Sequence, residues 1–141
     1  MTSFDGHCLC GQTEFKAKLE KDQQGHILCH CDTCKYLSGS VFTLNQIVPR
    51  SALTITKGKD SLGKYTYYGE SGKAVDCFFC KNCTSHIYHH QHVMGPDTII
   101  LRTGLLPKGQ KEFQPAAEIF GKAKLHWEKE VAQTFDTMPP S

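Results

Sequence analysis

Cys29-His30-Cys31-Asp32-Thr33-Cys34 places three thiols within six residues of one another. In this C-x-C-x-x-C order the sulfurs can converge if residues 31–34 form a tight turn and Cys29 enters at the end of a strand. His30, between two of the candidate ligands, is expected to point away from the metal. Zinc in proteins takes four ligands, so the run is one ligand short of a closed site. It predicts either a zinc whose fourth position is open to water or substrate, or part of a four-cysteine structural site completed from elsewhere.

Short β-strands and turns surround this run. Ile27 and Leu28 predict a short strand that delivers Cys29, and residues 35–40 predict a helical turn that Gly39 ends. Apolar and polar side chains alternate over residues 12–20, as in a half-buried strand. We expect further strands at residues 41–48, 53–57, 65–68, 74–79, 87–88 and 98–101. Because there is almost no helical periodicity, the sequence predicts a mainly β, antiparallel domain. Apolar residues after Ala117, including Trp127, predict a tail that packs back over the sheet.

The eight cysteines form three groups along the chain. Their spacing allows two closed four-cysteine sites, or one closed site and one open three-thiolate site with a cysteine to spare. If Cys77 and Cys80 share an extended strand, their odd separation points them to opposite faces. On that reasoning Cys80 and Cys83 join Cys8 and Cys10, and Cys77 is left over.

Cys77 and a cluster of histidines each have two interpretations. Cys77 is either a buried thiol that behaves as a small apolar side chain or a fourth ligand of the central site. On a strand, His86, His90 and His92 would share a face. An exposed polar segment is the preferred interpretation, and the alternative is ligation or an acid–base role near the open zinc. The clustered histidines are His86, His89, His90 and His92.

Composition restricts the classes of function. The chain has 141 residues, 39% of them hydrophobic, and a formal net charge of +2. These values predict one domain with a real core. Lysines and arginines do not cluster, so nucleic acid and anionic membranes are not expected as partners. With no signal peptide or spanning segment in view, we expect a cytoplasmic protein, in which metal binding accounts for the cysteines better than disulfides.

Four ordered elements together resemble the glutathione-dependent formaldehyde-activating enzyme family, which includes the centromere protein V type (GFA/CENP-V). The resemblance implies an Mss4-like fold over one domain, residues 1–141, with a core at about residues 4–136. It implies a structural zinc on the first and last cysteine pairs and a second, catalytic zinc on the central three thiolates, or two Zn²⁺ per chain. The matching elements are Gly6–Gly11, Cys29–Cys34 with Ser38–Ser40 after it, Phe79–Cys83, and Trp127. The implied ligands are Cys8, Cys10, Cys80 and Cys83 for the structural zinc, and Cys29, Cys31 and Cys34 for the second zinc.

Two positions depart from the family pattern. Thr84 stands where a glycine usually follows the last cysteine pair. Cys77 stands where the family often has a basic residue, commonly arginine. If that residue holds an anionic substrate such as glutathione in the relatives, this chain has lost that contact.

An open zinc on three thiolates suits thiol chemistry. Such a metal deprotonates a bound thiol and can polarise a carbonyl, although three thiolates leave a net charge of −1 that weakens it as a Lewis acid. We therefore expect a carbon–sulfur lyase that joins or releases a glutathione-like thiol and a small aldehyde or other electrophile, as an S-(hydroxymethyl)glutathione synthase does. The alternatives are a non-enzymatic Mss4-like interaction or chaperone module, and a zinc enzyme recruited to a biosynthetic pathway. Small molecules are the expected partners, and a homodimer is compatible with the sequence.

Overall fold

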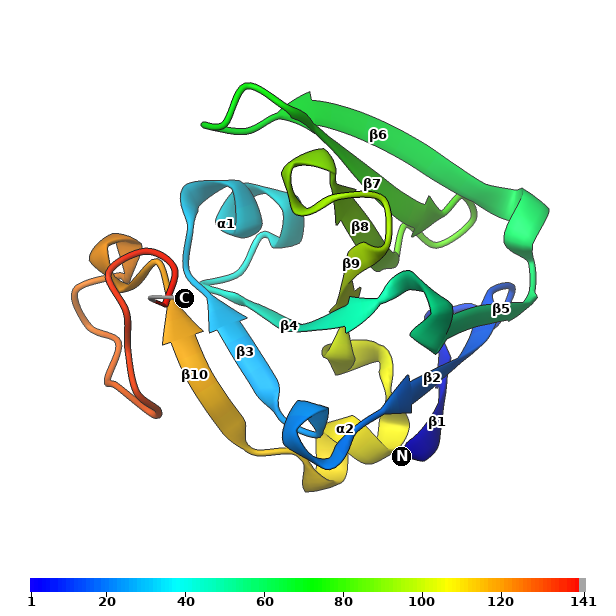
Figure 1. Ribbon diagram of the computed structural model, residues 1–141, viewed down its shortest axis with the longest axis horizontal. Helices are drawn as coiled ribbons and strands as arrows, with labels where there is room; N and C mark the ends of the chain where they lie inside the picture. Colours follow the sequence, from blue (N-terminus) through cyan, green and yellow to red (C-terminus); the bar gives the residue numbers. More distant parts are fainter. Residues whose placement is uncertain (140–141) are drawn as a thin grey trace.

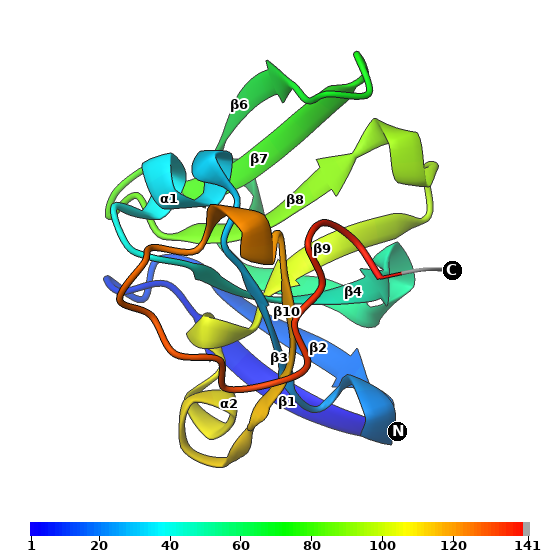
Figure 2. The same ribbon diagram turned by 90° about the vertical axis from the view of Figure 1, so that its left-hand side faces the viewer.

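The computed structural model describes residues 1–139 as a mainly β protein (Figures 1 and 2). The last two residues of the predicted domain lie outside the described part. The strands are β1 (Thr2–His7), β2 (Glu14–Leu19), β3 (His26–Cys29), β4 (Thr43–Pro49), β5 (Leu53–Lys57), β6 (Leu62–Tyr68), β7 (Ala74–Cys80), β8 (His86–Gln91), β9 (Thr98–Arg102) and β10 (Pro115–Ile119). The α-helices are α1 (Asp32–Ser38) and α2 (Pro107–Glu112), and the 3-10 turns are η1 (Lys21–Gln23), η2 (Arg50–Ala52), η3 (Lys59–Ser61), η4 (His92–Met94), η5 (Thr103–Leu105) and η6 (Gly121–Ala123).

The strands form two sheets. A three-stranded sheet has the order β1-β2-β5, and a seven-stranded sheet has the order β10-β3-β4-β9-β8-β7-β6. Neighbouring strands run antiparallel, except that β10 pairs in parallel with β3. The predicted mainly β fold is therefore confirmed, with one parallel pair at an edge. None of the helices in residues 1–139 is long and apolar enough to span a membrane.

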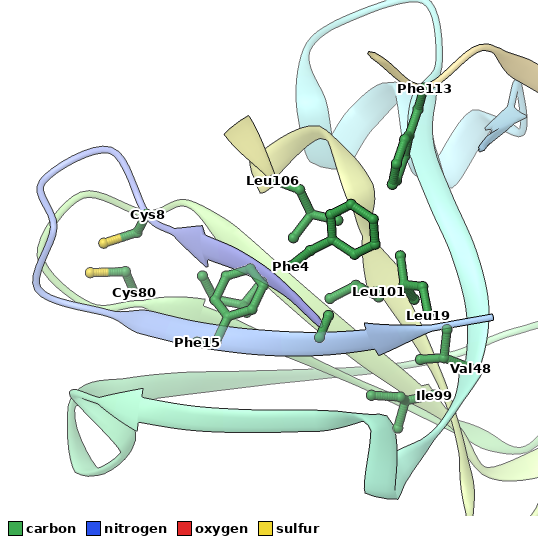
Figure 3. Close-up of a cluster of buried hydrophobic side chains, with 12 residues drawn as sticks. Phe4, Cys8, Phe15, Leu19, Val48, Cys80, Ile99, Leu101, Leu106 and Phe113 are labelled. Atoms are coloured by element: carbon green, nitrogen blue, oxygen red, sulfur yellow. The ribbon is translucent and has the colours of Figure 1, made fainter. Parts of the chain in front are cut away.

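Alternation along β9 shows how the large sheet separates the core from the candidate site. Ile99 and Leu101 are fully buried and pack in the core, together with Phe4 and Phe15 of the small sheet (Figure 3). Ile100 and Arg102 have the opposite parity, so they point to the other face of the sheet, where both line a cavity. One strand thus contributes to the core on one face and to a ligand-sized space on the other.

The structure corrects several predicted boundaries. β1, β10 and α2 were not predicted from the sequence, and the strand predicted at residues 98–101 extends to Arg102. The tail does not cover the sheet with its tryptophan, because Trp127 is 62% exposed. It runs back beside β10 instead, where Glu118 N–H donates to the Gln133 carbonyl (Figure 2).

Candidate functional site

The first thiol group brings together the first and the last cysteine pairs of the sequence. Cys8 and Cys10 lie in the turn after β1, Cys80 ends β7, and Cys83 follows it, with their sulfurs all within 4.8 Å of one another. The Sγ atoms of Cys8 and Cys10 are 3.6 Å apart, and those of Cys10 and Cys80 are 3.8 Å apart. A zinc bonded to four thiolates at about 2.3 Å spaces its sulfurs by about 3.8 Å. These four thiols therefore fit a closed tetrahedral site, and Figure 3 shows Cys8 and Cys80 side by side at one end of the core.

Backbone N–H groups help to position the sulfurs of this first thiol group. Thr13 N–H donates to Cys8 Sγ at 3.2 Å, and Gln12 N–H donates to Cys10 Sγ at 3.4 Å, so the turn around Gly11 offers its donors to sulfur. Ser85 links the two halves, because its hydroxyl accepts from Leu9 N–H and lies 3.2 Å from Cys83 Sγ. The hydrogen bond from Ser85 lowers the pKa of Cys83 to about 5, which favours the thiolate form that binds metals.

The second thiol group is local. Cys29 ends β3, Cys31 is the N-cap of α1, and Cys34 lies in the first turn of that helix. Cys34 N–H donates to Cys31 Sγ at 3.3 Å, and the three sulfurs lie within 4.8 Å of one another. Hydrogen bonds with Cys29 and Cys31 strongly lower the pKa of Cys34. Hydrogen bonds with Cys31 and Cys34 raise the pKa of Cys29. The geometry fits three of the four ligands of a tetrahedral metal ion.

A cavity of about 420 Å³ opens onto this second group. Its volume is in the range of small-molecule sites. The three thiols lie in one wall, and much of the remaining surface is apolar. Other residues of the wall come from strands β3, β4, β6, β7, β8 and β9, and include Ile27, Asn45, Tyr67, Val75, His89, Ile100 and Arg102.

Arg102 brings a buried positive charge to the same cavity. Its side chain is 7% exposed, and its guanidinium donates to Asn45 Oδ1 and lies 3.5 Å from His86 Nδ1. No carboxylate of residues 1–139 forms an ion pair with it. Asn45 in turn donates to Thr43 Oγ1 at 2.9 Å. A hydrogen bond from Thr43 and the charge of Arg102 both add to the effect of the neighbouring thiols in lowering the pKa of Cys34.

His86 and His89 are neutral and lie beside Arg102. Burial, reinforced by the positive charge of Arg102, lowers the pKa of each imidazole to about 3. Their rings meet edge to face at 5.5 Å, and within residues 1–139 His86 Nε2 and His89 Nδ1 are buried without a hydrogen-bond partner. The sequence prediction that His86 shares a face with His90 and His92 is wrong, because the register of β7 and β8 shifts after Phe78.

His90 and His92 belong to a different cluster. They lie with Asp76 in a third group whose ligand atoms are within 4.8 Å of one another. His92 Nε2 is 2.8 Å from Asp76 Oδ2, and the two imidazoles stack. Asp76 alternates with Val75 and Cys77 along β7, so this cluster points away from the cavity.

Cys77 is 3% exposed and belongs to neither thiol group. It shares the face of Val75 on β7, whereas Cys80 packs in the core, as their odd separation predicts. Burial raises the pKa of Cys77 to about 11. The geometry therefore supports an inert buried thiol rather than a fourth ligand.

Comparisons with known proteins identify the family. The family model described as glutathione-dependent formaldehyde-activating enzyme matches residues 3–123. The chain belongs to this family. The resemblance noted in the sequence is thereby confirmed.

Individual relatives of this GFA family protein are distant. An uncharacterized lyase of Schizosaccharomyces pombe is 28% identical over 62% of this chain and 58% of its own length. A protein of Emericella nidulans whose name describes it as a glutathione-dependent formaldehyde-activating enzyme is 27% identical over 64% of this chain and 44% of its own length. The chain therefore spans about half the length of these relatives. A crystal structure of a Rhodobacter sphaeroides protein matches with a TM-score of 0.57 and 19% identity, over 79% of this chain and 99% of that one, which supports the fold.

A buried network holds the central thiol loop of this GFA family protein. His30 is fully buried and points away from the thiols, with its Nε2 2.7 Å from Glu118 Oε1. Glu118 also binds Lys124 Nζ at 2.9 Å and accepts from Val131 N–H at 2.8 Å. The network ties the loop between Cys29 and Cys31 to β10 and the tail.

Sequence reasoning missed Arg102, Asn45 and Glu118. Arg102 and Glu118 each carried one signal in the sequence. Arg102 is a charged residue at the end of an apolar strand segment, and Glu118 is a charged residue within one. Such residues are rarely fully buried unless they are paired or functional. Asn45, between Leu44 and Gln46, carried no such signal.

Proposed function

We propose that this protein is a zinc-dependent carbon–sulfur lyase that joins a glutathione-like thiol to a small aldehyde, or releases the two from their adduct. One observation carries the proposal. Cys29, Cys31 and Cys34 converge in the wall of a small-molecule cavity, and no fourth residue of the described chain joins their group. Three protein ligands and an accessible fourth position are typical of catalytic zinc sites. Family membership and the names of the relatives support the same chemistry.

Two zinc ions per chain are part of this proposal. Cys8, Cys10, Cys80 and Cys83 would hold a structural ion in a closed site, and the three central thiols would hold the catalytic one. Zinc bound there would lower the pKa of a substrate thiol and polarise the aldehyde oxygen. The reaction is balanced without an oxidant or a reductant. The thiol S–H bond breaks, a carbon–sulfur bond forms at the carbonyl carbon, and the carbonyl oxygen gains the proton.

The chain's own residues prepare the site for this reaction. The contact between His30 and Glu118 holds one side of the thiol loop, and the hydrogen bond from Cys34 N–H to Cys31 Sγ holds the start of α1. Apolar side chains such as Ile27, Val75 and Ile100 line the cavity and limit the water that competes for the aldehyde. Both effects favour addition of sulfur over hydration of the carbonyl.

The test is catalysed exchange between free thiol, aldehyde and adduct. With ¹³C-formaldehyde and glutathione, NMR exchange spectroscopy should show faster interconversion when the protein is present than when it is absent. Cys34→Ser should lose at least about tenfold of this acceleration, because it removes a ligand of the proposed open zinc. Cys77→Ala is the matched control, since it also removes a buried thiol but should retain activity. Absence of acceleration for a panel of thiols and aldehydes, with both zinc ions present, would contradict the proposed function.

A further inference from the structure

Arg102 is a buried cation whose described partners are neutral. Its guanidinium contacts the Asn45 amide oxygen and the neutral His86 ring, and it lies in the cavity wall at 7% exposure. A guanidinium stays protonated in proteins, and an isolated buried charge is strongly unfavourable. The remaining donors of this side chain are therefore suited to an anion other than a carboxylate of residues 1–139.

Polar side chains link Arg102 to the surroundings of the central thiols. A continuous polar path runs from Arg102 through the Asn45 amide to Thr43 Oγ1, which lies beside Cys34. The cavity's other charged residues, Glu70 and Lys73, are exposed. Exposed charges act through water and contribute far less than a buried one. Among the charged side chains of the cavity, Arg102 is thus the one whose charge water screens least.

The net charge of the metal site shows how Arg102 would affect the binding of an anionic substrate. Three thiolates and one divalent cation sum to −1, and an ionised thiol substrate beside them brings the total to −2. Adding Arg102 changes the total to −1, so the buried guanidinium offsets the one negative charge that an anionic fourth ligand adds.

Resting on the proposed function, we propose that Arg102 is the anion-binding residue of the cavity, and that it stabilises the sulfur anion a substrate brings to Cys29, Cys31 and Cys34. The ligand class is an ionisable thiol, whether or not it carries a carboxylate. Arg102 acts through charge at the sulfur and not through a salt bridge to a distant carboxylate of the substrate.

Thiol binding by variants of the zinc-loaded protein tests this role. The probes are 2-mercaptoethanol, which has no carboxylate, and mercaptoacetate, which has one, titrated by calorimetry. Arg102→Gln should weaken binding of both thiols by at least about tenfold, with zinc content still at two per chain. Arg102→Lys keeps the charge and should recover much of that loss. Lys73→Gln is the matched control, because it removes an exposed charge from the same cavity and should change the affinity by less than about twofold.

A second variant tests the same role if Arg102→Gln does not fold. Asn45→Asp keeps the side-chain shape and places a carboxylate against Arg102, so it should neutralise the guanidinium and weaken both thiols as Arg102→Gln does. Unchanged affinities in Arg102→Gln and Asn45→Asp would overturn the role of Arg102 but not the proposed function. A loss restricted to mercaptoacetate would also overturn it, in favour of carboxylate recognition. Failure of the wild-type protein to bind either thiol would overturn both this inference and the proposed function.

Discussion

Thr84 has a backbone conformation that glycine adopts more easily. Its φ is 69°, in the left-handed region, and it follows the last cysteine of the first thiol group. A β-branched residue pays a steric penalty there, which explains why a glycine is the usual residue at this position in the family pattern. Thr84→Gly is expected to raise the free energy of unfolding by about 1 kcal/mol, measured by chemical denaturation of the zinc-loaded protein. Thr84→Ala should give a smaller gain, and destabilisation by Thr84→Gly would show that the hydroxyl contributes more than the strain costs.

Cys77 is the second of the two positions at which the chain departs from the family pattern described above. Because it is buried outside both thiol groups, Cys77→Ala should keep two zinc ions per chain. Loss of the sulfur from a packed site should lower the free energy of unfolding by about 1–2 kcal/mol. Metal analysis and denaturation of the same sample test both effects. A drop to one zinc would mean that Cys77 is a ligand and that the site is closed to substrate.

Residue identities in the site were predictable only where the interaction is local. The thiols were predictable because their spacing in the sequence is itself the ligand spacing. Arg102 meets Asn45 across 57 residues, and Glu118 meets His30 across 88 residues, so no sequence window contains either pair. Arg102 reaches the cavity from the end of β9, and only the order of the strands in the sheet shows that a basic residue lies there.

At the scale of elements, the parallel pairing of β10 with β3 positions the thiol loop. His30 follows β3 and binds Glu118 of β10, and the tail closes over that carboxylate with Lys124 and two backbone N–H groups. Burial alone would raise the pKa of Glu118, but the hydrogen bonds from Val131, Lys124 and His30 outweigh it and lower the pKa to about 2. The charged carboxylate is therefore part of the folded state.

This network predicts a pH dependence of stability. A carboxyl whose pKa falls on folding stabilises the protein fully above its unfolded value, about 4.5, and loses that contribution as the pH falls toward 2. Glu118→Gln should lower the free energy of unfolding by about 3 kcal/mol at pH 7. The difference between wild type and variant should shrink below pH 4.5, in unfolding curves measured from pH 7 to pH 3. A difference that stays constant over this range would show that the charge of Glu118 does not matter.

Element prediction succeeded where alternation was clear and failed at the edges. β2 is flanked by β1 and β5 and shows strict alternation, so its position was predictable. β1 and β10 have partly polar or exposed faces, and β10 pairs with a strand far away in sequence. Such strands are stabilised by tertiary pairing more than by local propensity.

At the scale of the whole molecule, the two thiol groups have different structural consequences. The first joins segments about 70 residues apart and lies against the core, whereas the second closes a loop of six residues. Metal-binding energy at the first group would therefore also be folding energy. Cys83→Ser should lower the free energy of unfolding by more than about 5 kcal/mol, and Cys34→Ser by about 1–2 kcal/mol with loss of activity. Thermal unfolding of the two variants measures this difference, and equal damage would indicate two structural sites.

X-ray absorption at the zinc edge, before and after addition of a thiol, reports directly on the open coordination position. With one four-thiolate site and one three-thiolate site, the average sulfur coordination per zinc should be about 3.5 in the free protein and should rise to about 4 when 2-mercaptoethanol binds. The same protein carrying Cys34→Ser should show no such rise. An average of 4 before any thiol is added, or an average that stays at 3.5 at saturating thiol, would contradict an open zinc on Cys29, Cys31 and Cys34.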